Sequence, residues 1–236
     1  MLFAAVFLVG IVSAIAFIWE RTKRGGVRAL LLKAFTSVMF VACGAVGAVE
    51  AAGSGNSHFA LMVLMGLVFG LMGDIWLDLK WVYQEDNDTY TFAGFGSFII
   101  GHLMFITAVI LKYANNSKLI YIAVPALISL VAAIGMLLLE KPMKMDYGRF
   151  KPITVFYTFI VSFMAFLCGG LALMNDFKIF SLNMMFAGGI FFALSDLILS
   201  GTYFGVGKRR PIDIITNHGT YYAAQFLIAS SLIFLK

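Results

Sequence analysis

Two aspartates stand inside long apolar runs of this sequence. Asp74 lies in Leu71-Met-Gly-Asp-Ile-Trp and Asp196 in Phe192-Ala-Leu-Ser-Asp-Leu-Ile, in a chain of which only 12% of the residues are charged. A carboxylate at membrane depth costs roughly 3 kcal/mol or more, so it needs a partner, water or a chemical task. Two carboxyls in one low-dielectric cavity cannot both ionise easily, and we expect one to stay protonated near neutral pH. Such a pair can donate and accept a proton.

The elements that must position these carboxyls are membrane helices. The chain is 61% apolar and 15% aromatic, and runs of about 20 apolar residues are long enough to cross the hydrocarbon layer. We predict an all-α polytopic bundle forming one membrane domain over residues 1–236, with the first run a true span rather than a signal peptide. The eight predicted spans are 1–19, 29–49, 58–79, 92–111, 119–139, 152–173, 182–203 and 212–235. An acidic loop, 80–91, is expected between the third and fourth.

The basic residues predict the orientation of the bundle. Thirteen Lys and Arg residues fall on one side of the predicted spans and four on the other. The positive-inside rule places the richer side in the cytosol, so both termini face outward. The net charge of +5 is then a topological signal, and we expect the lipid bilayer as a partner and no nucleic acid. The short loops favour a bacterial plasma membrane over an organelle.

Polar side chains gather in the cytosolic half of the predicted spans. Met62, Gly66, Gly70, Asp74 and Asp78 recur every four residues and share one helix face, whose glycines let a neighbouring helix approach. A second stripe runs from Gly189 to Ser200 through Asp196, and a third face carries the polar residues of the last span. The candidate site residues are Asp74 and Asp196 as the catalytic pair, with Lys33, Asp78, His102, Ser195, His218, Tyr221, Tyr222 and Gln225 in supporting roles.

Several of these residues also have a purely structural interpretation. Asp74 or Asp196 could simply pair with Lys33, and Asp78 is close enough to the cytosolic surface to be an ordinary interfacial charge. His102 could be a hydrogen-bonded core histidine, and the two adjacent tyrosines of the last span could be aromatic-belt anchors. Ser195 could be a nucleophile, although a serine in a membrane helix usually bonds its own backbone.

Metal and cofactor chemistry is not expected. The sequence has no HExxH, no GxSxG and no phosphate-binding glycine loop. His58 opens the third span on the outer side and His218 enters the last from the cytosol, so most of the bilayer separates them, whereas a zinc ligand lies about 2 Å from the metal. We therefore predict no metal ion and no cofactor.

Three motifs, taken in order, resemble those of the lysoplasmalogenase, or YhhN-type, membrane family. The motifs are Gly73-Asp74 followed by Phe95-Gly-Ser-Phe-Ile-Ile-Gly-His102, then Phe191-Phe-Ala-Leu-Ser-Asp196, and finally Thr220-Tyr-Tyr-Ala-Ala-Gln225-Phe-Leu-Ile. The resemblance covers all eight predicted spans. It departs from the usual pattern at Ala34, where the family often has Pro, and at Phe105, where it usually has Tyr.

The resemblance implies hydrolysis of the vinyl ether bond of a lysoplasmalogen. The products would be a fatty aldehyde and glycerophosphoethanolamine or glycerophosphocholine, and Asp74 and Asp196 match the family's proposed acid and base. The chemistry suits the residues, because protonation of the vinyl ether carbon and addition of water need one carboxylic acid and one carboxylate, as in glycoside cleavage. Which aspartate donates is left open.

Two other functions remain open on the sequence alone. A proton-coupled transporter would also place aspartates inside a glycine-rich bundle, although neither an inverted repeat nor a pair of broken helices is visible. A non-catalytic lipid-binding protein is the alternative if both aspartates are merely structural ion pairs.

Overall fold

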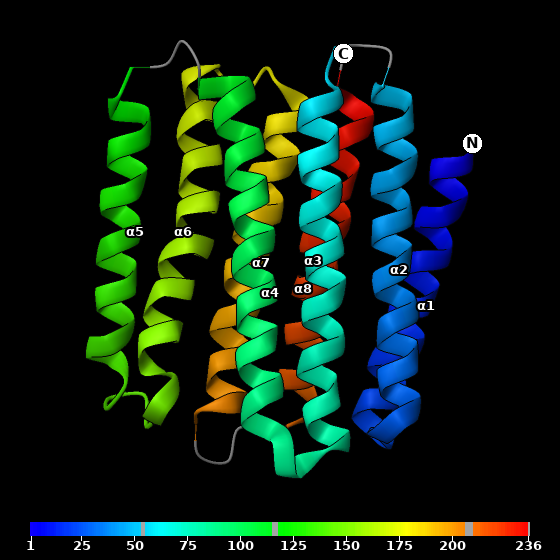
Figure 1. Cartoon of the computed structure of the whole chain (residues 1–236), viewed down its shortest axis with the longest axis vertical. Helices are drawn as coiled ribbons and strands as arrows, with labels where there is room; N and C mark the ends of the chain where they lie inside the picture. Colours follow the sequence, from blue (N-terminus) through cyan, green and yellow to red (C-terminus); the bar gives the residue numbers. More distant parts are fainter. Residues whose placement is uncertain (53–54, 115–117, 206–209, 236) are drawn as a thin grey trace.

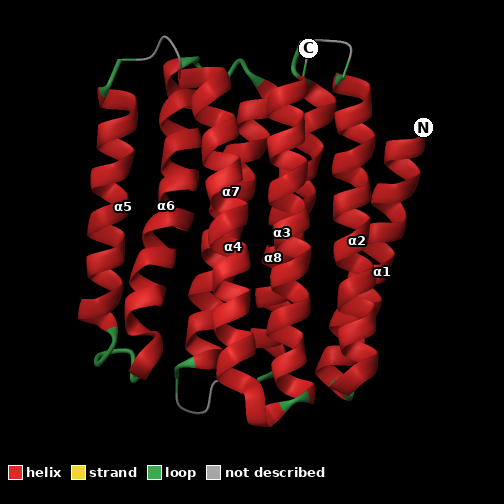
Figure 2. Ribbon diagram, viewed as in Figure 1, coloured by secondary structure: helices red, strands yellow, loops and turns green. Residues whose placement is uncertain are grey.

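The structure is a computed structural model that describes residues 1–52, 55–114, 118–205 and 210–235. Within these ranges the chain forms α-helices and no strand ladder, as predicted from the composition (Figure 2). The helices are α1 (Leu2–Lys23), α2 (Gly26–Ala51), α3 (Ser57–Val82), α4 (Asn87–Val109), α5 (Ile120–Leu139), α6 (Lys151–Met174), α7 (Phe180–Tyr203) and α8 (Pro211–Ser230).

The helices run up and down in a single bundle, with α5 at one edge and α1 at the other (Figure 1). Consecutive helices pack on one another except α4 and α5, and α8 closes the bundle by packing on α7, α1, α2 and α3. Helix α5 packs along α6. The N-terminal end of α1 and the C-terminal end of α8 lie at the same end of the bundle (Figure 1). The predicted cytosolic side is therefore the end at which α1, α3, α5 and α7 finish.

Seven helices of the described chain, α1 to α7, are long and apolar enough to cross a membrane. Helix α8 forms over 20 residues, but its polar side chains hold its hydropathy below that of the others. A multi-pass helical membrane protein is thus confirmed in outline. The count of eight spans and the outward termini stay predictions.

The helix boundaries differ most from the predicted ones between α3 and α4. Helix α3 continues to Val82, a short 3-10 turn covers Gln84–Asp86, and α4 begins at Asn87. The predicted acidic loop over 80–91 is therefore wrong, because most of its residues extend the two helices beyond the apolar runs. Asp74 consequently lies farther from the C-terminal end of its helix than the apolar run alone predicts.

Glycines on α3 allow the close helix packing that their spacing predicts. A Cβ added at Gly66 would lie 2.9 Å from the carbonyl oxygen of Gly101 on α4, and one at Gly70 would lie 2.8 Å from Nε2 of Gln225 on α8. On the second stripe, a Cβ at Gly189 would lie 2.9 Å from Cα of Ala165 on α6. The absence of side chains at these points brings α3 and α7 against the helices that complete the site.

The turn between α1 and α2 depends on two glycines. Gly25 and Gly26 both have a φ of +69°, a conformation that L-residues with a side chain rarely adopt. This tight reversal places Arg21, in the last turn of α1, beside Lys33 on α2. The turn thus sets the geometry of the charged cluster described next.

Candidate active site

Four charged side chains from the first three helices form one buried cluster. Nζ of Lys33 lies 3.1 Å from Oδ1 of Asp74 and 3.2 Å from Oδ1 of Asp78. Arg21 forms an ion pair with Oδ2 of Asp78. Asp74 and Asp78 are only 2% and 4% exposed. The interpretation of Asp78 as an interfacial surface charge is therefore wrong: its position one turn beyond Asp74 turns it into the bundle.

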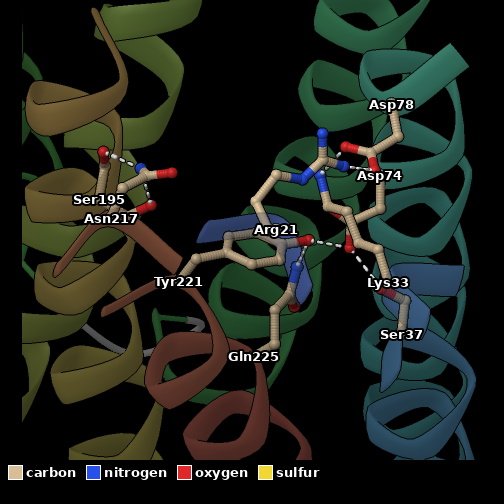
Figure 3. Close-up of polar contacts among 9 residues, drawn as sticks. All are labelled: Arg21, Lys33, Ser37, Asp74, Asp78, Ser195, Asn217, Tyr221 and Gln225. Atoms are coloured by element: carbon tan, nitrogen blue, oxygen red, sulfur yellow. Dashed lines mark hydrogen bonds and ion pairs between the residues drawn. The ribbon is translucent and has the colours of Figure 1, made fainter. Parts of the chain in front are cut away.

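The second carboxylate oxygen of Asp74 is held by two hydroxyls. Oδ2 accepts hydrogen bonds from Oγ of Ser37 at 2.6 Å and from the hydroxyl of Tyr221 at 2.7 Å. Nε2 of Gln225 in turn donates to the Tyr221 oxygen at 2.9 Å. Figure 3 shows this chain of contacts from α8 across to α2 and α3. With Lys33 on Oδ1, Asp74 has three donors, a set suited to an ionised carboxylate.

Asp196 has a different environment. Its Oδ2 accepts a hydrogen bond from the hydroxyl of Tyr157 on α6 at 2.8 Å. Among the described residues, no Lys, Arg or His side chain forms an ion pair with it. The pairing with Lys33 that the sequence left open for either aspartate is thus observed for Asp74 and not for Asp196.

A cavity of about 720 Å³ contains both aspartates in its lining. One wall carries the charged cluster on α1, α2 and α3, together with Tyr221 of α8. Asp196 and Tyr157 line it from α7 and α6, and its far wall is an apolar face of α5 with Ala132, Gly135 and Met136. Pockets of about 300–1,000 Å³ are the usual size for a small-molecule ligand. The cavity therefore has room for a ligand that touches both carboxyls.

The loop between α5 and α6 lines the cavity at the end of the bundle that is predicted to face the cytosol. Tyr147 is buried there, and burial, reinforced by the neighbouring Glu140, raises the pKa of its hydroxyl. The Glu140 carboxylate accepts hydrogen bonds from Lys151 and from the backbone N–H of Tyr147, which lower its pKa. The loop is thus tied down by a glutamate that stays ionised.

Ser195 lies beside the catalytic candidate but has a structural contact. Nδ2 of Asn217 donates to the Ser195 carbonyl at 2.7 Å and to its Oγ at 3.1 Å, which joins α8 to α7 (Figure 3). No side chain of the described residues that could act as a base accepts a hydrogen bond from this hydroxyl. The arrangement gives no support to a nucleophilic serine.

His102 is a buried residue of the core rather than part of the cavity lining. Its Nδ1 is 2.9 Å from the carbonyl oxygen of Phe98, and its ring meets that of Phe192 edge-on, with centroids 4.4 Å apart. Its Nε2 is buried and has no hydrogen-bond partner among the described residues. Behind Tyr157, with centroids 6.4 Å apart, it can support the tyrosine that holds Asp196.

The polar face predicted for the last helix divides into two parts. Tyr221 and Gln225 point towards Asp74, as described above. His218 and Tyr222 instead pack edge-on against Phe17 of α1, with ring centroids 4.8 and 5.8 Å apart. His218 also lines the cavity. Both tyrosines are buried, so they are not aromatic-belt anchors.

Sequence reasoning missed four residues of the site, namely Arg21, Ser37, Tyr157 and Asn217. Ser37 lies four residues after Lys33 and shares its face, so helical spacing could have identified it. Arg21 lies beyond the predicted first span, 1–19, yet α1 continues through it to Lys23. Tyr157 lies in a mostly apolar run that gives no sign of a functional role. Only the fold, which brings its hydroxyl to Asp196, identifies it as a site residue.

Comparison with known proteins gives a family for this chain. The family model described as "YhhN family" matches residues 27–232. No curated protein and no solved structure gives a significant match. The matched segment includes Lys33, both aspartates, Tyr157 and the polar residues of α8, and it covers most of the sequence. The chain therefore belongs to the YhhN family.

Proposed function

We propose that the protein is a membrane hydrolase that cleaves the vinyl ether bond of lysoplasmalogens, a lysophospholipid substrate class. The observation that carries the proposal is that two carboxyls with different environments line one cavity. The membership of the YhhN family supports a lysoplasmalogenase-type activity. The products would be a long-chain aldehyde and a glycerophospho-alcohol, formed in a bacterial plasma membrane.

Charge balance assigns a role to each carboxyl. Arg21 and Lys33 carry two positive charges, and Asp74 and Asp78 carry two negative ones, so the cluster is neutral when all four are ionised. An ionised Asp196 would add a charge with no cation beside it among the described residues. Because charges away from water need compensation, we assign the protonated carboxyl to Asp196.

The proton of Asp196 would start the reaction. Tyr157 donates to Oδ2, which leaves Oδ1 to carry the proton. That proton is transferred to the β-carbon of the vinyl ether, and the α-carbon and ether oxygen become an oxocarbenium ion. Tyr157 then stabilises the Asp196 carboxylate, because a hydrogen bond to an ionised group is stronger than one to a neutral group.

Asp74 would act on the cation and on water. Its negative charge stabilises the oxocarbenium ion, and its carboxylate can accept a proton as a water oxygen bonds to the α-carbon. The hemiacetal then loses its hydroxyl proton to the Asp196 carboxylate, while the glycerol oxygen leaves with the proton held by Asp74. The sum is one alkenyl ether and one water converted to one aldehyde and one alcohol, with both carboxyls restored.

The direct test compares three lysolipids with the purified protein. The three carry the same head group and an alkenyl, a saturated alkyl or an acyl chain, and the products are identified by mass spectrometry. We expect a fatty aldehyde from the alkenyl lipid alone. Fatty acid release from the acyl lipid would contradict the proposal in favour of ester hydrolysis. Uptake of lipid or protons into liposomes without any product would favour a transporter.

Tyr157→Phe should lower kcat about tenfold to a hundredfold and leave KM nearly unchanged. The loss follows because the carboxylate formed by proton transfer no longer receives its hydrogen bond. Steady-state aldehyde formation measures it. Tyr121→Phe on α5 is the matched control, since it removes a hydroxyl outside this cavity. Equal kinetics of the two variants would remove Tyr157 from the mechanism.

Treatment with a chelator should leave aldehyde release unchanged. The proposed steps use carboxyls, a tyrosine and water and call for no metal ion. The measurement is activity before and after incubation with EDTA and dialysis. Activity that falls and returns on addition of one divalent metal would require a different mechanism.

A further inference from the structure

The cavity that contains the carboxyls is polar on one side and apolar on the other. Arg21, Lys33, Asp74 and Asp78 line the side formed by α1, α2 and α3, where the cavity also reaches the Gly25–Gly26 turn at the cytosolic end. The opposite side is formed by α5, at the far edge of the bundle (Figure 1). Asp196 and Tyr157 belong to helices α7 and α6, which stand between these two walls (Figure 1).

The α5 wall is a single helix face. Ala132, Gly135, Met136 and Leu139 follow the i, i+3, i+4, i+7 spacing of one face and all line the cavity. The face is apolar. It leaves open space at Gly135, since a Cβ added there would meet no atom within 4 Å. The wall therefore offers open apolar space in the same cavity as the carboxyl on α7.

Apolar side chains that line the cavity on α5 and α7 are also well exposed. Leu139 of α5 and Leu197 of α7 both line the cavity, yet they are 50% and 58% exposed. Helix α5 packs along α6 and has no extensive contact with α7 in the described chain. Because α5 stands at one edge of the bundle (Figure 1), an apolar chain that passed between α5 and α7 would enter the hydrocarbon of a membrane.

We propose that Gly135 and its neighbours on α5 form the binding site for the hydrocarbon chain, which reaches the bilayer between α5 and α7. The occupant is a single-chain ether lipid with its head group at the cytosolic, charged side and its vinyl ether beside Asp196. This inference rests on the proposed function and adds the path of the chain and the residues that set which chains are accepted. From α1 to α5 the cavity offers charged groups, then the carboxyl of Asp196, then an apolar face. A single-chain ether lipid has its head group, vinyl ether and hydrocarbon chain in the same order.

Gly135→Phe tests the chain path. The phenyl ring would fill the open space against α5, so kcat/KM for an alkenyl lipid with a 16- or 18-carbon chain should fall about tenfold or more. The value for a lipid with a four-carbon alkenyl chain should change less than about twofold, because its chain ends near the carboxyls. Gly96→Phe on α4 is the matched control, since a Cβ there also meets no atom within 4 Å and Gly96 does not line the cavity.

A binding measurement keeps this inference separate from the proposed reaction. A saturated ether lysophospholipid with a diazirine midway along its chain binds but cannot be hydrolysed. Irradiation should label the peptide of α5 that contains Ala132–Met136, or the part of α6 that packs against it. Gly135→Phe should abolish the labelling, and Gly96→Phe should keep it. Labelling confined to other helices, or an equal loss of short-chain and long-chain turnover in folded Gly135→Phe, would overturn the inference. If the wild type labels α5 but releases no aldehyde, the chain path is supported and the reaction is refuted.

Discussion

Asp196→Asn should reduce aldehyde release from an alkenyl lysolipid by about 10²–10⁴-fold, the usual range for loss of a general acid. Asparagine keeps the shape of the side chain and can still accept the hydrogen bond that Tyr157 donates to Oδ2, but it has no acidic proton to transfer. Substrate binding should change little, so the loss should fall on kcat. Coupled assay of the aldehyde, with lipid affinity measured separately, checks both parts.

The control for this substitution is Asp176→Asn. Asp176 forms an exposed ion pair with Lys178 in the loop between α6 and α7, away from the cavity. Its loss should leave activity unchanged. If Asp196→Asn kept wild-type turnover while folded in detergent, the carboxyl on α7 would not be the proton donor. The same experiment on Asp74→Asn should also abolish turnover, since the cation would lose its carboxylate.

Lys33→Met should destabilise the protein by about 3–5 kcal/mol, the cost of leaving a buried ion pair without its partner. Lys33 serves both Asp74 and Asp78, and its removal leaves two carboxylates facing Arg21 alone. The double variant Lys33→Met with Asp74→Asn restores charge balance, because Arg21 still pairs with Asp78. We therefore expect the double variant to regain most of the stability while remaining inactive.

A double-mutant cycle measured by thermal or denaturant unfolding in detergent gives the coupling energy. Lys178→Met is the matched control, since its exposed pair with Asp176 should contribute only about 0–1 kcal/mol. Additive effects of the two substitutions at Lys33 and Asp74 would mean that this pair makes no contribution to stability.

The helices were predictable because the bilayer requires long apolar runs, and every predicted span overlaps an observed helix. Errors lie at the helix ends, where polar residues such as Asn87 and Asp88 belong to a helix although hydropathy does not predict one there. The convergence of Asp74 with Tyr221 and Gln225 followed from helical spacing. Family motifs pointed to the same residues, so the two sources are consistent.

The sequence alone could not predict which side chains of the site form ion pairs and hydrogen bonds with one another. Spacing can place Lys33 and Asp78 on faces that look inward, but it cannot say which carboxylate Lys33 will meet or that Arg21 will complete the cluster. Tyr157 carries no local signal, because a tyrosine in an apolar helix is usually part of the packing. Only the packing of α6 against α7 brings its hydroxyl to Asp196.

The charged cluster is built entirely by the first three helices in chain order, and the Gly25–Gly26 turn joins the first two of them. During synthesis, Arg21, Lys33, Asp74 and Asp78 can therefore neutralise one another once α3 has emerged, before any later helix is made. The two carboxylates and two cations need not enter lipid singly, which lowers the free energy of insertion. Lengthening or stiffening that turn should accordingly harm biogenesis, and the yield of inserted protein would fall even where the finished fold tolerates the change.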